Sequence, residues 1–218
     1  MKKYVPLLVV LAVVLIVVGW LFSAYNSFIA LGETANTQWA QVESQYQRRA
    51  DLIPSLVNTV KGFAKQELTV FTEVTNARAN ASSIQVTPEV LNDPQLFAKW
   101  QAAQGQLTGA LSRLLVTVEA YPALKSDANF LALQNQLEGT ENRIATERMR
   151  FNETVRSYNI KAKGIPGKWL VSMFGLDAEK LLFEATEGAE VAPTVDFGTD
   201  TPAVKTPAQD AAAEVIVE

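Results

Sequence analysis

The side chains best suited to chemistry in this sequence are carboxylates and arginines that recur on or beside the apolar seams of long heptad-like segments. They are Glu67, Glu141, Glu147, Arg49, Arg143 and Arg148. Carboxylates on facing bundle helices can hold a di-metal centre, but the established pattern pairs Glu with Glu-x-x-His motifs, and this chain has no His. We therefore interpret these residues as interhelical charge pairs that fix helix register, in preference to a carboxylate-only metal site or a polar ligand pocket.

Other catalytic chemistry also lacks its usual residues. The chain contains no Cys, which excludes disulfides, thiolate metal sites, a lipobox lipid anchor and cysteine catalysis. Ser or Thr nucleophiles need an activating base, and neither His nor a lysine at a predicted core position is present to supply one. We predict a protein that is not an enzyme and that has no metal, cofactor or catalytic residues.

The charge balance argues against nucleic acid as a partner. The net charge is -4 and the sequence pI is near 5.1, whereas sequence-independent nucleic-acid binding relies on basic patches. Arg48 and Arg49, and the pair Lys61 and Lys65, are too sparse to form such a patch. We expect no nucleic-acid partner.

An uncharged apolar run over residues 5–22 predicts an N-terminal transmembrane helix. As an α-helix it would span about 27 Å, roughly the hydrocarbon thickness of a bilayer. The predicted membrane-spanning residues include Val5, Leu11, Ile16, Trp20 and Phe22. A cleavable signal peptide would have a shorter apolar region followed by a small-x-small cleavage site, which residues 22–24 match poorly. The run therefore favours an uncleaved single-pass anchor in contact with the lipid bilayer.

The cations near this run predict its orientation. Lys2 and Lys3 precede it, and the next cation along the chain is Arg48. The positive-inside rule then places the N-terminus in the cytoplasm and the rest of the chain on the periplasmic or outer side of a bacterial inner membrane.

Downstream of the anchor, apolar residues recur at alternating steps of three and four. The three series run from Trp39 to Ala77, from Leu96 to Tyr121 and from Phe130 to Tyr158. This spacing is typical of left-handed helix packing, and neighbouring apolar positions widen each stripe beyond a two-stranded seam. We predict an all-α fold: a single N-terminal transmembrane helix, then an antiparallel bundle of three long helices with heptad packing as in coiled coils, and a short fourth helix.

Breaks in the pattern predict where these helices end. The first should cover residues 36–78, with a kink at Pro54. The expected boundaries of the others are Asp93-Pro94 and Pro122 for the second helix, and Ser126 or Asp127 and residues 163–167 for the third.

The pattern changes after residue 167. Apolar residues at 169–176 either cover the open end of the bundle or touch lipid or a partner, and the candidate interaction residues are Trp169, Leu170, Met173 and Phe174. Asp177 could cap a short helix over residues 178–186. Residues 188–218 are acidic and rich in Pro, and they predict a disordered tail because they can bury too little apolar surface to offset their ordering entropy. The expected domains are an anchor over residues 1–27, a bundle over residues 28–187 and this tail.

Two aromatic–asparagine pairs lie on the third seam. Phe151-Asn152 and Tyr158-Asn159 are seven residues apart, so both aromatics fall on one helix face. We interpret the aromatics as core residues, and the flanking amides could read a ligand.

Three stretches of the chain resemble proteins of the LemA family. They are residues 39–67, beginning WAQVESQYQRRADLIPSLV; residues 121–144, with YPALK and QNQLEGTENRI; and residues 150–166, with RFNETVRSYN and then Ile165-Pro166. Phe151 stands where the family usually has Tyr, and Ile165 where Phe commonly precedes the proline. The resemblance implies a bacterial membrane protein with one N-terminal span and an antiparallel bundle. It implies no chemistry, because the family has no agreed activity; a relative associated with magnetosome membranes hints at membrane organisation.

These observations lead to two functional hypotheses. The first is a membrane-tethered interaction or scaffold protein whose protein partners remain to be identified. The alternative is a small-molecule-sensing bundle that works with a membrane partner, and it is suggested by polar seam residues such as Arg49 and Glu67.

Overall fold

The computed structural model describes residues 4–84 and 87–184, and every regular element within them is helical. The elements are α1 (Val5–Phe63), α2 (Leu68–Ser83), the short 3-10 helix η2 (Pro88–Asn92), α3 (Pro94–Val118), α4 (Pro122–Lys125), α5 (Ala128–Lys163) and α6 (Gly167–Phe174). The predicted all-α class is confirmed, because the described ranges contain no strand.

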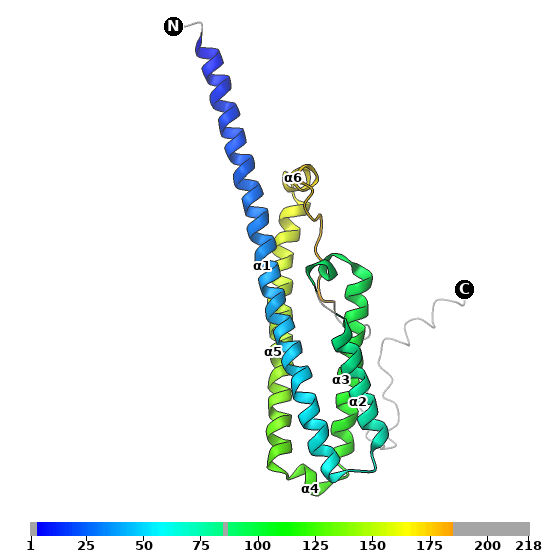
Figure 1. The fold of residues 1–218 in the computed structure, drawn as a ribbon. Helices are drawn as coiled ribbons and strands as arrows, with labels where there is room; N and C mark the ends of the chain where they lie inside the picture. Colours follow the sequence, from blue (N-terminus) through cyan, green and yellow to red (C-terminus); the bar gives the residue numbers. More distant parts are fainter. Residues whose placement is uncertain (1–3, 85–86, 185–218) are drawn as a thin grey trace, which may run out of the picture. The chain divides into compact units, whose positions relative to one another are not determined.

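Helix α1 joins the apolar N-terminal segment to the bundle without interruption. Its 59 residues continue past Pro54. Residues 5–20 are all exposed, and the first buried side chain of the helix is that of Phe28. Figure 1 shows this first part of α1 standing clear of the other helices. By length and composition, α1 is the one helix in the described ranges that could cross a membrane.

The first helix of the bundle ends earlier than the sequence pattern predicted. A helix over residues 36–78 is wrong: α1 ends at Phe63, and the chain turns before α2 begins at Leu68. Gly62 weakens the helix just before this turn, and the small side chain of Ala64 is buried inside it. Helix α2 then returns and packs its apolar face into the core that α1 already lines. The heptad spacing persists across the turn because both helices face one core.

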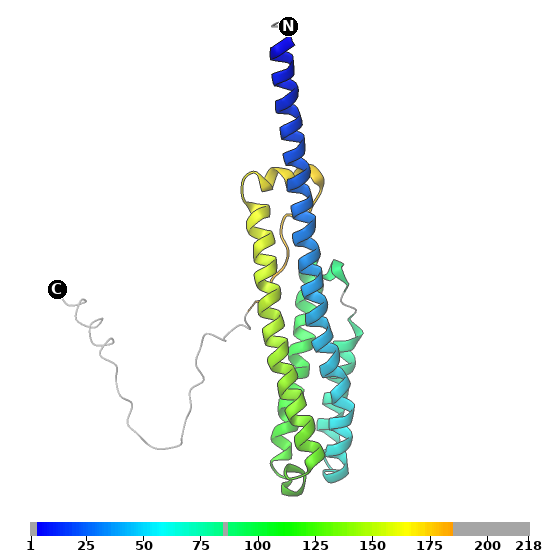
Figure 2. The ribbon, with the colours of Figure 1, turned by 90° about the vertical axis from the view of Figure 1, so that its left-hand side faces the viewer.

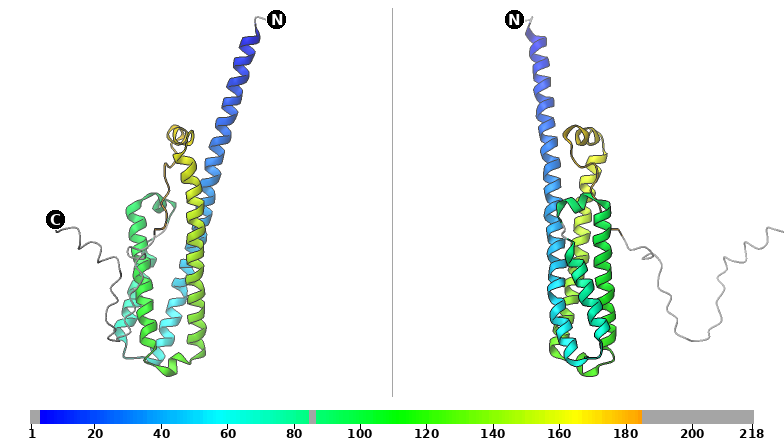
Figure 3. Two further views of the ribbon diagram at one scale, coloured as in Figure 1. Left: turned by 180° about the vertical axis from the view of Figure 1, so that it is seen from behind. Right: turned by 45° about the vertical axis from the view of Figure 1, so that its right-hand side comes forward.

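The bundle is formed by α1, α2, α3 and α5, with the predicted first helix divided in two. Helix α1 packs along α5, and α2 packs along α3, as Figure 1 and the right-hand view of Figure 3 show. The predicted caps are confirmed. The Asp93 carboxylate accepts hydrogen bonds from the backbone N–H groups of Gln95 and Leu96, and that of Asp127 accepts one from Phe130.

Buried side chains form three clusters that follow one another along α1. The first, around Phe28, contains Tyr158 of α5 and Leu170 of α6. The second is rich in aromatics and is centred on Trp39. The third begins at Ile53 and fills the end of the bundle farthest from the apolar segment, where α1, α2, α3 and α5 all contribute.

The segment after α5 differs from expectation. Helix α6 ends at Phe174 and is capped by Gly175, whose φ of 65° is a left-handed conformation that glycine adopts without strain. The predicted helix over residues 178–186 is wrong for its described part, because residues 176–184 contain no helix. Figure 2 shows α6 lying across the direction of α1 and α5. The predicted tail over residues 188–218 lies outside the described residues, as do Lys2 and Lys3.

Candidate functional site

Two asparagines of α5 hold residues 177–183, which we call the strap. Asn159 donates to the Lys180 carbonyl and accepts from the Lys180 N–H, both at 2.8 Å. Asn152 makes the same pair of hydrogen bonds to Phe183, both at 2.9 Å. Each side-chain amide thus satisfies the donor and the acceptor of one strap residue. These bonds replace the backbone pairing that a helix would have provided.

The spacing of the two asparagines matches the spacing of the backbone groups that they bind. Seven residues of α-helix rise about 10.5 Å, and three residues of extended chain span about 10 Å. Asn152 and Asn159 therefore meet Phe183 and Lys180 in register. Both side-chain amides therefore bind backbone groups of the protein's own chain, and no strap side chain takes part in these bonds.

The aromatic partners of these asparagines lie in the core, as predicted. Phe151 is fully buried, and Tyr158 is buried while its hydroxyl donates to the Asp177 carbonyl at 2.8 Å. Phe183, at the end of the strap, packs among aromatic rings from α1, α3 and α5, at centroid distances of 5.3–5.9 Å from Trp39, Phe97, Trp100 and Phe151. The strap thereby ties three helices together. The sequence signal was the seven-residue spacing of the Phe-Asn and Tyr-Asn pairs, but nothing in the sequence named residues 180 and 183 as their partners.

Replacing Asn159 by alanine should release the strap near Lys180. Two hydrogen bonds are lost, so the Lys180 amide should exchange with solvent about ten- to a hundredfold faster, measured by hydrogen–deuterium exchange. Asn142→Ala is the matched control, because Asn142 is an exposed asparagine on the same helix. An unchanged exchange rate of the Lys180 amide in Asn159→Ala would contradict the role of Asn159 in holding the strap.

A buried arginine links three helices near the middle of the bundle. Arg49 is only 2% exposed. Its guanidinium donates to Glu141 of α5 at 2.9 Å and to Thr108 of α3 at 3.0 Å, and it also donates to Gln104 of α3. The predicted interhelical charge pair is therefore confirmed for Arg49 and Glu141. This network fixes the register of α1 against both α3 and α5.

The other polar seam residues also make specific contacts. The predicted interhelical charge pairs are wrong for Glu67 and Glu147. Glu67 accepts a hydrogen bond from the Tyr121 hydroxyl, and Glu147 forms its ion pair with Arg150 of its own helix and accepts a hydrogen bond from Gln38 of α1. Arg148 lies over the Phe183 ring, 4.4 Å from its centroid. Within residues 4–84 and 87–184, no group of three or more His, Cys, Asp or Glu side chains is placed to hold a metal ion.

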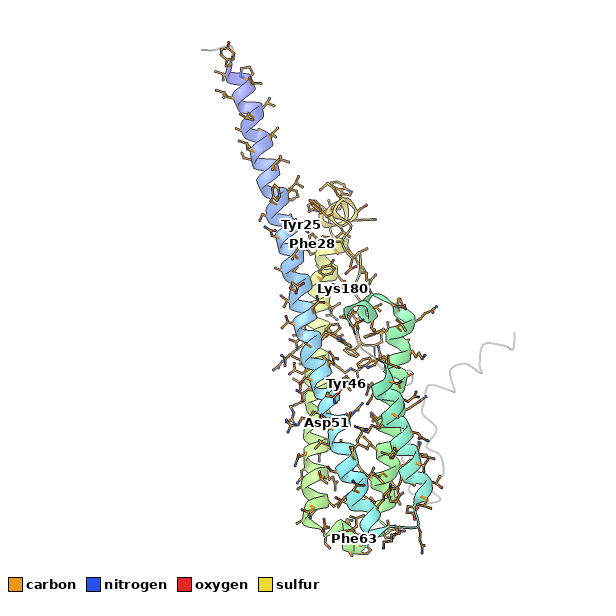
Figure 4. The ribbon with its side chains drawn as sticks, in the orientation of Figure 1. Tyr25, Phe28, Tyr46, Asp51, Phe63 and Lys180 are labelled. Atoms are coloured by element: carbon orange, nitrogen blue, oxygen red, sulfur yellow. The ribbon has the colours of Figure 1, made fainter. Side chains whose placement is uncertain are left out.

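Tyr46 joins the Arg49 network to the aromatic cluster. Its ring lies under the Arg49 guanidinium at 5.0 Å and meets Trp100 edge to face at 4.9 Å. Burial raises the pKa of Tyr46 above its ordinary value, although the charges of Arg148 and Arg49 act in the opposite direction. The phenol therefore stays neutral at physiological pH and is unsuited to act as a base. Figure 4 shows Tyr46 within the bundle, between the labelled Phe28 and Phe63.

A half-open pocket of about 400 Å³ adjoins this network. Tyr46, Trp100 and Gln104 form part of its wall, and Glu43 and Gln47 of α1 lie at its exposed side. A carboxylate, two amides and two aromatic rings could hold a small polar or cationic molecule. Of the seam residues named for the sensing hypothesis, Arg49 does not line this pocket but contacts two lining residues, Tyr46 and Gln104, whereas Glu67 lies in the turn between α1 and α2.

The four candidate interaction residues all lie on α6, but they differ in how far they are buried. Leu170 is buried against the core around Phe28. Trp169 and Met173 are exposed, and Phe174 is partly covered by Tyr25, whose ring centroid is 4.9 Å away. Part of the apolar segment thus closes the end of the bundle, and part of it remains uncovered.

The family model described as LemA family matches residues 38–197. The chain belongs to the LemA family. Among curated LemA-like relatives, the magnetosome protein MamQ of Magnetospirillum gryphiswaldense is 26% identical over 184 residues, which cover 77% of this chain and 68% of MamQ. The magnetosome proteins MamQ 1 and MamQ 2 of Paramagnetospirillum magneticum are each 25% identical over 187 residues, covering 78% of this chain and 69% of theirs.

The LemA match leaves out the α1 residues before position 38, which include the exposed apolar part of α1 as well as Tyr25 and the buried Phe28. It begins at residue 38 and covers the Arg49 network, Asn152 and Asn159, α6 and the strap. Family membership, the relatives' names and the apolar N-terminal helix together fit a membrane-associated, non-enzymatic protein.

Proposed function

We propose that this LemA-family protein is an interaction scaffold anchored in the bacterial inner membrane. Residues 5–22 of α1 cross the bilayer, the N-terminus lies in the cytoplasm, and the bundle lies on the periplasmic or outer side. The observation that carries the proposal is the continuity of α1, which leads from an exposed apolar segment into the bundle core as one uninterrupted helix. The bundle is therefore held at a fixed height above the membrane.

Exposed apolar side chains at the far end of the bundle support a role in binding proteins. Leu68 at the start of α2 is 68% exposed, and Val116 near the end of α3 is 67% exposed. Phe63, also exposed, lies at this end in Figure 4. Covering such side chains with a partner removes apolar surface from water and so favours binding. This end of the bundle is also the part best placed to meet a partner away from the lipid.

Photo-crosslinking in intact cells tests the scaffold role. A photoreactive amino acid at Leu68 or Val116 should capture the same specific proteins repeatedly. The control position is Ser157, which is exposed on the side of α5. Identical capture at all three positions, limited to abundant bystanders, would argue against the proposal.

A reporter that is active only outside the cytoplasm tests the topology. Fused after residue 184, it should be active, and a reporter that needs the cytoplasm should be inactive at the same place. The reverse result would place the bundle in the cytoplasm.

The relatives' description as magnetosome proteins belongs to those proteins, and it supports here only the proposal of a membrane-organising role.

The pocket beside Tyr46 favours a second candidate function, a bundle that senses a small molecule together with a membrane partner. Its ligand would contact Glu43, Gln47 and Gln104, and through Tyr46 would bias the Arg49 network. A thermal-shift screen with amines and other small polar compounds should find a stabilising class. That stabilisation should disappear in Glu43→Ala, whereas equal stabilisation of both proteins would place the ligand elsewhere.

A further inference from the structure

We propose that α6 lies in the headgroup region of the membrane that α1 crosses, with Trp169 and Met173 directed into the lipid. This inference rests on the proposed membrane anchorage. It adds a second lipid contact, so that the protein meets the bilayer with two helices at a fixed angle.

The position of α6 along α1 is the first support. The exposed apolar run ends at Phe22, and α6 packs beside Tyr25 and Phe28. Along the helix, Tyr25 lies about 4.5 Å and Phe28 about 9 Å beyond Phe22, and the interfacial region of one leaflet is about 5–8 Å thick. If residues 5–22 fill the hydrocarbon core, the part of α6 around Phe174, beside Tyr25, is therefore at the depth of the headgroups, and the part around Leu170, beside Phe28, is at their outer edge.

The direction of α6 is the second support. Figure 2 shows it lying across the direction of α1, and Figure 1 shows it nearly end-on while α1 is seen from the side. When α1 runs along the membrane normal, α6 consequently lies close to the membrane plane. Amphipathic helices that bind lipid surfaces take this orientation.

The two faces of α6 have different surroundings. Leu170 and Val171 are each 5% exposed and pack on the core around Phe28. Trp169 and Met173 lie four residues apart on another face and are 67% and 58% exposed. A Trp at this depth can bury its ring in lipid while its N–H stays among polar headgroups.

Basic residues accompany this apolar face. Lys168 is an exposed residue of α6, and Lys163, at the end of α5, is exposed and pairs with Glu179. Lys161 donates to Ser27 of α1 and lies over the Phe28 ring. Cations at this level complement anionic lipid headgroups. Lipid is therefore the occupant that both the chemistry of this face and its continuity with the membrane span favour over a protein partner.

The absence of cysteine allows a site-specific test on the full chain. Single variants Met173→Cys, Met149→Cys and Leu11→Cys would be labelled with an environment-sensitive NBD probe and reconstituted into vesicles of phosphatidylcholine and phosphatidylglycerol. Quenching by doxyl-labelled phosphatidylcholine then reports contact with lipid. Met149 is the matched control, because it is 57% exposed against 58% for Met173 but lies on the side of α5. Leu11 reports the span itself.

The proposal expects several-fold stronger quenching at position 173 than at position 149, together with strong quenching at position 11. Quenching at position 11 but equal, weak quenching at 173 and 149 would overturn the α6 contact and leave the anchor intact. A blue-shifted probe at 173 that doxyl lipid does not quench would show a protein surface there, either a second copy or a partner, and would also overturn it. Weak quenching at all three positions would overturn both the anchor and the α6 contact.

Discussion

Replacing Trp39 by alanine should lower the free energy of unfolding by about 3–5 kcal/mol, the usual cost of deleting a large buried aromatic side chain. Trp39 is 3% exposed, and its ring contacts those of Phe97, Trp100, Phe151 and Phe183. Its removal leaves a cavity between α1, α3 and α5 and takes away the ring that stacks on Phe183. Urea unfolding of the full chain in detergent, followed by circular dichroism at the helix band, measures the loss.

Trp39→Phe separates the effect of packing from that of the indole N–H. Trp39 Nε1 is buried and has no hydrogen-bond acceptor among the described residues. Phenylalanine keeps a ring in the cluster and removes that unsatisfied donor, so Trp39→Phe should be clearly less destabilising than Trp39→Ala. Equal losses in the two variants would mean that the aromatic cluster contributes little as a packed unit.

Replacing Arg49 by alanine should lower the free energy of unfolding by about 2–4 kcal/mol, because it breaks a buried ion pair and leaves Thr108 and Gln104 without their donor. The expected loss lies toward the lower part of the range for fully buried pairs, since the side chain of Glu141 is 37% exposed and water can solvate it. Urea unfolding again supplies the measurement.

The control for this prediction is another arginine in an interhelical ion pair. Arg113 of α3 bonds Glu73 of α2 at 3.0 Å, but the two side chains are 63% and 43% exposed. Arg113→Ala should therefore change stability by only about 0–1 kcal/mol. If Arg49→Ala were as mild as Arg113→Ala, the buried network would not be holding the three helices in register.

Several features followed from the sequence because they depend on neighbouring residues. The helical ends at Asp93 and Asp127 are set by a side chain that caps the next few N–H groups. The heptad spacing of the Phe130 to Tyr158 series placed Phe151 and Tyr158 in the core, where both are buried. The buried Arg49–Glu141 pair could be anticipated as an interhelical contact, but its further partners Gln104 and Thr108 could not.

The turn after Phe63 shows where such local reasoning fails. Val60, Phe71 and Val74 keep helical spacing in the sequence, yet they lie on two antiparallel helices. A periodic pattern records which residues face a core, and it does not record whether the chain reverses between them. Gly62 was only a weak local signal for a turn, and the chain reverses after Phe63 because α2 packs along α3.

The apolar N-terminal helix, the helical class, the caps and the membership of the LemA family could all be predicted before folding was considered, since each depends on composition, on short-range periodicity or on ordered matches along the chain. The way the strap is held and the face of α6 that stays uncovered depend instead on how the helices pack. Asn152 and Phe183 are 31 residues apart in the chain but share two hydrogen bonds. Leu170 is buried and Trp169 exposed because α6 rests on α1 and α5. Contacts between distant segments fix both outcomes, and a local pattern carries no information about them.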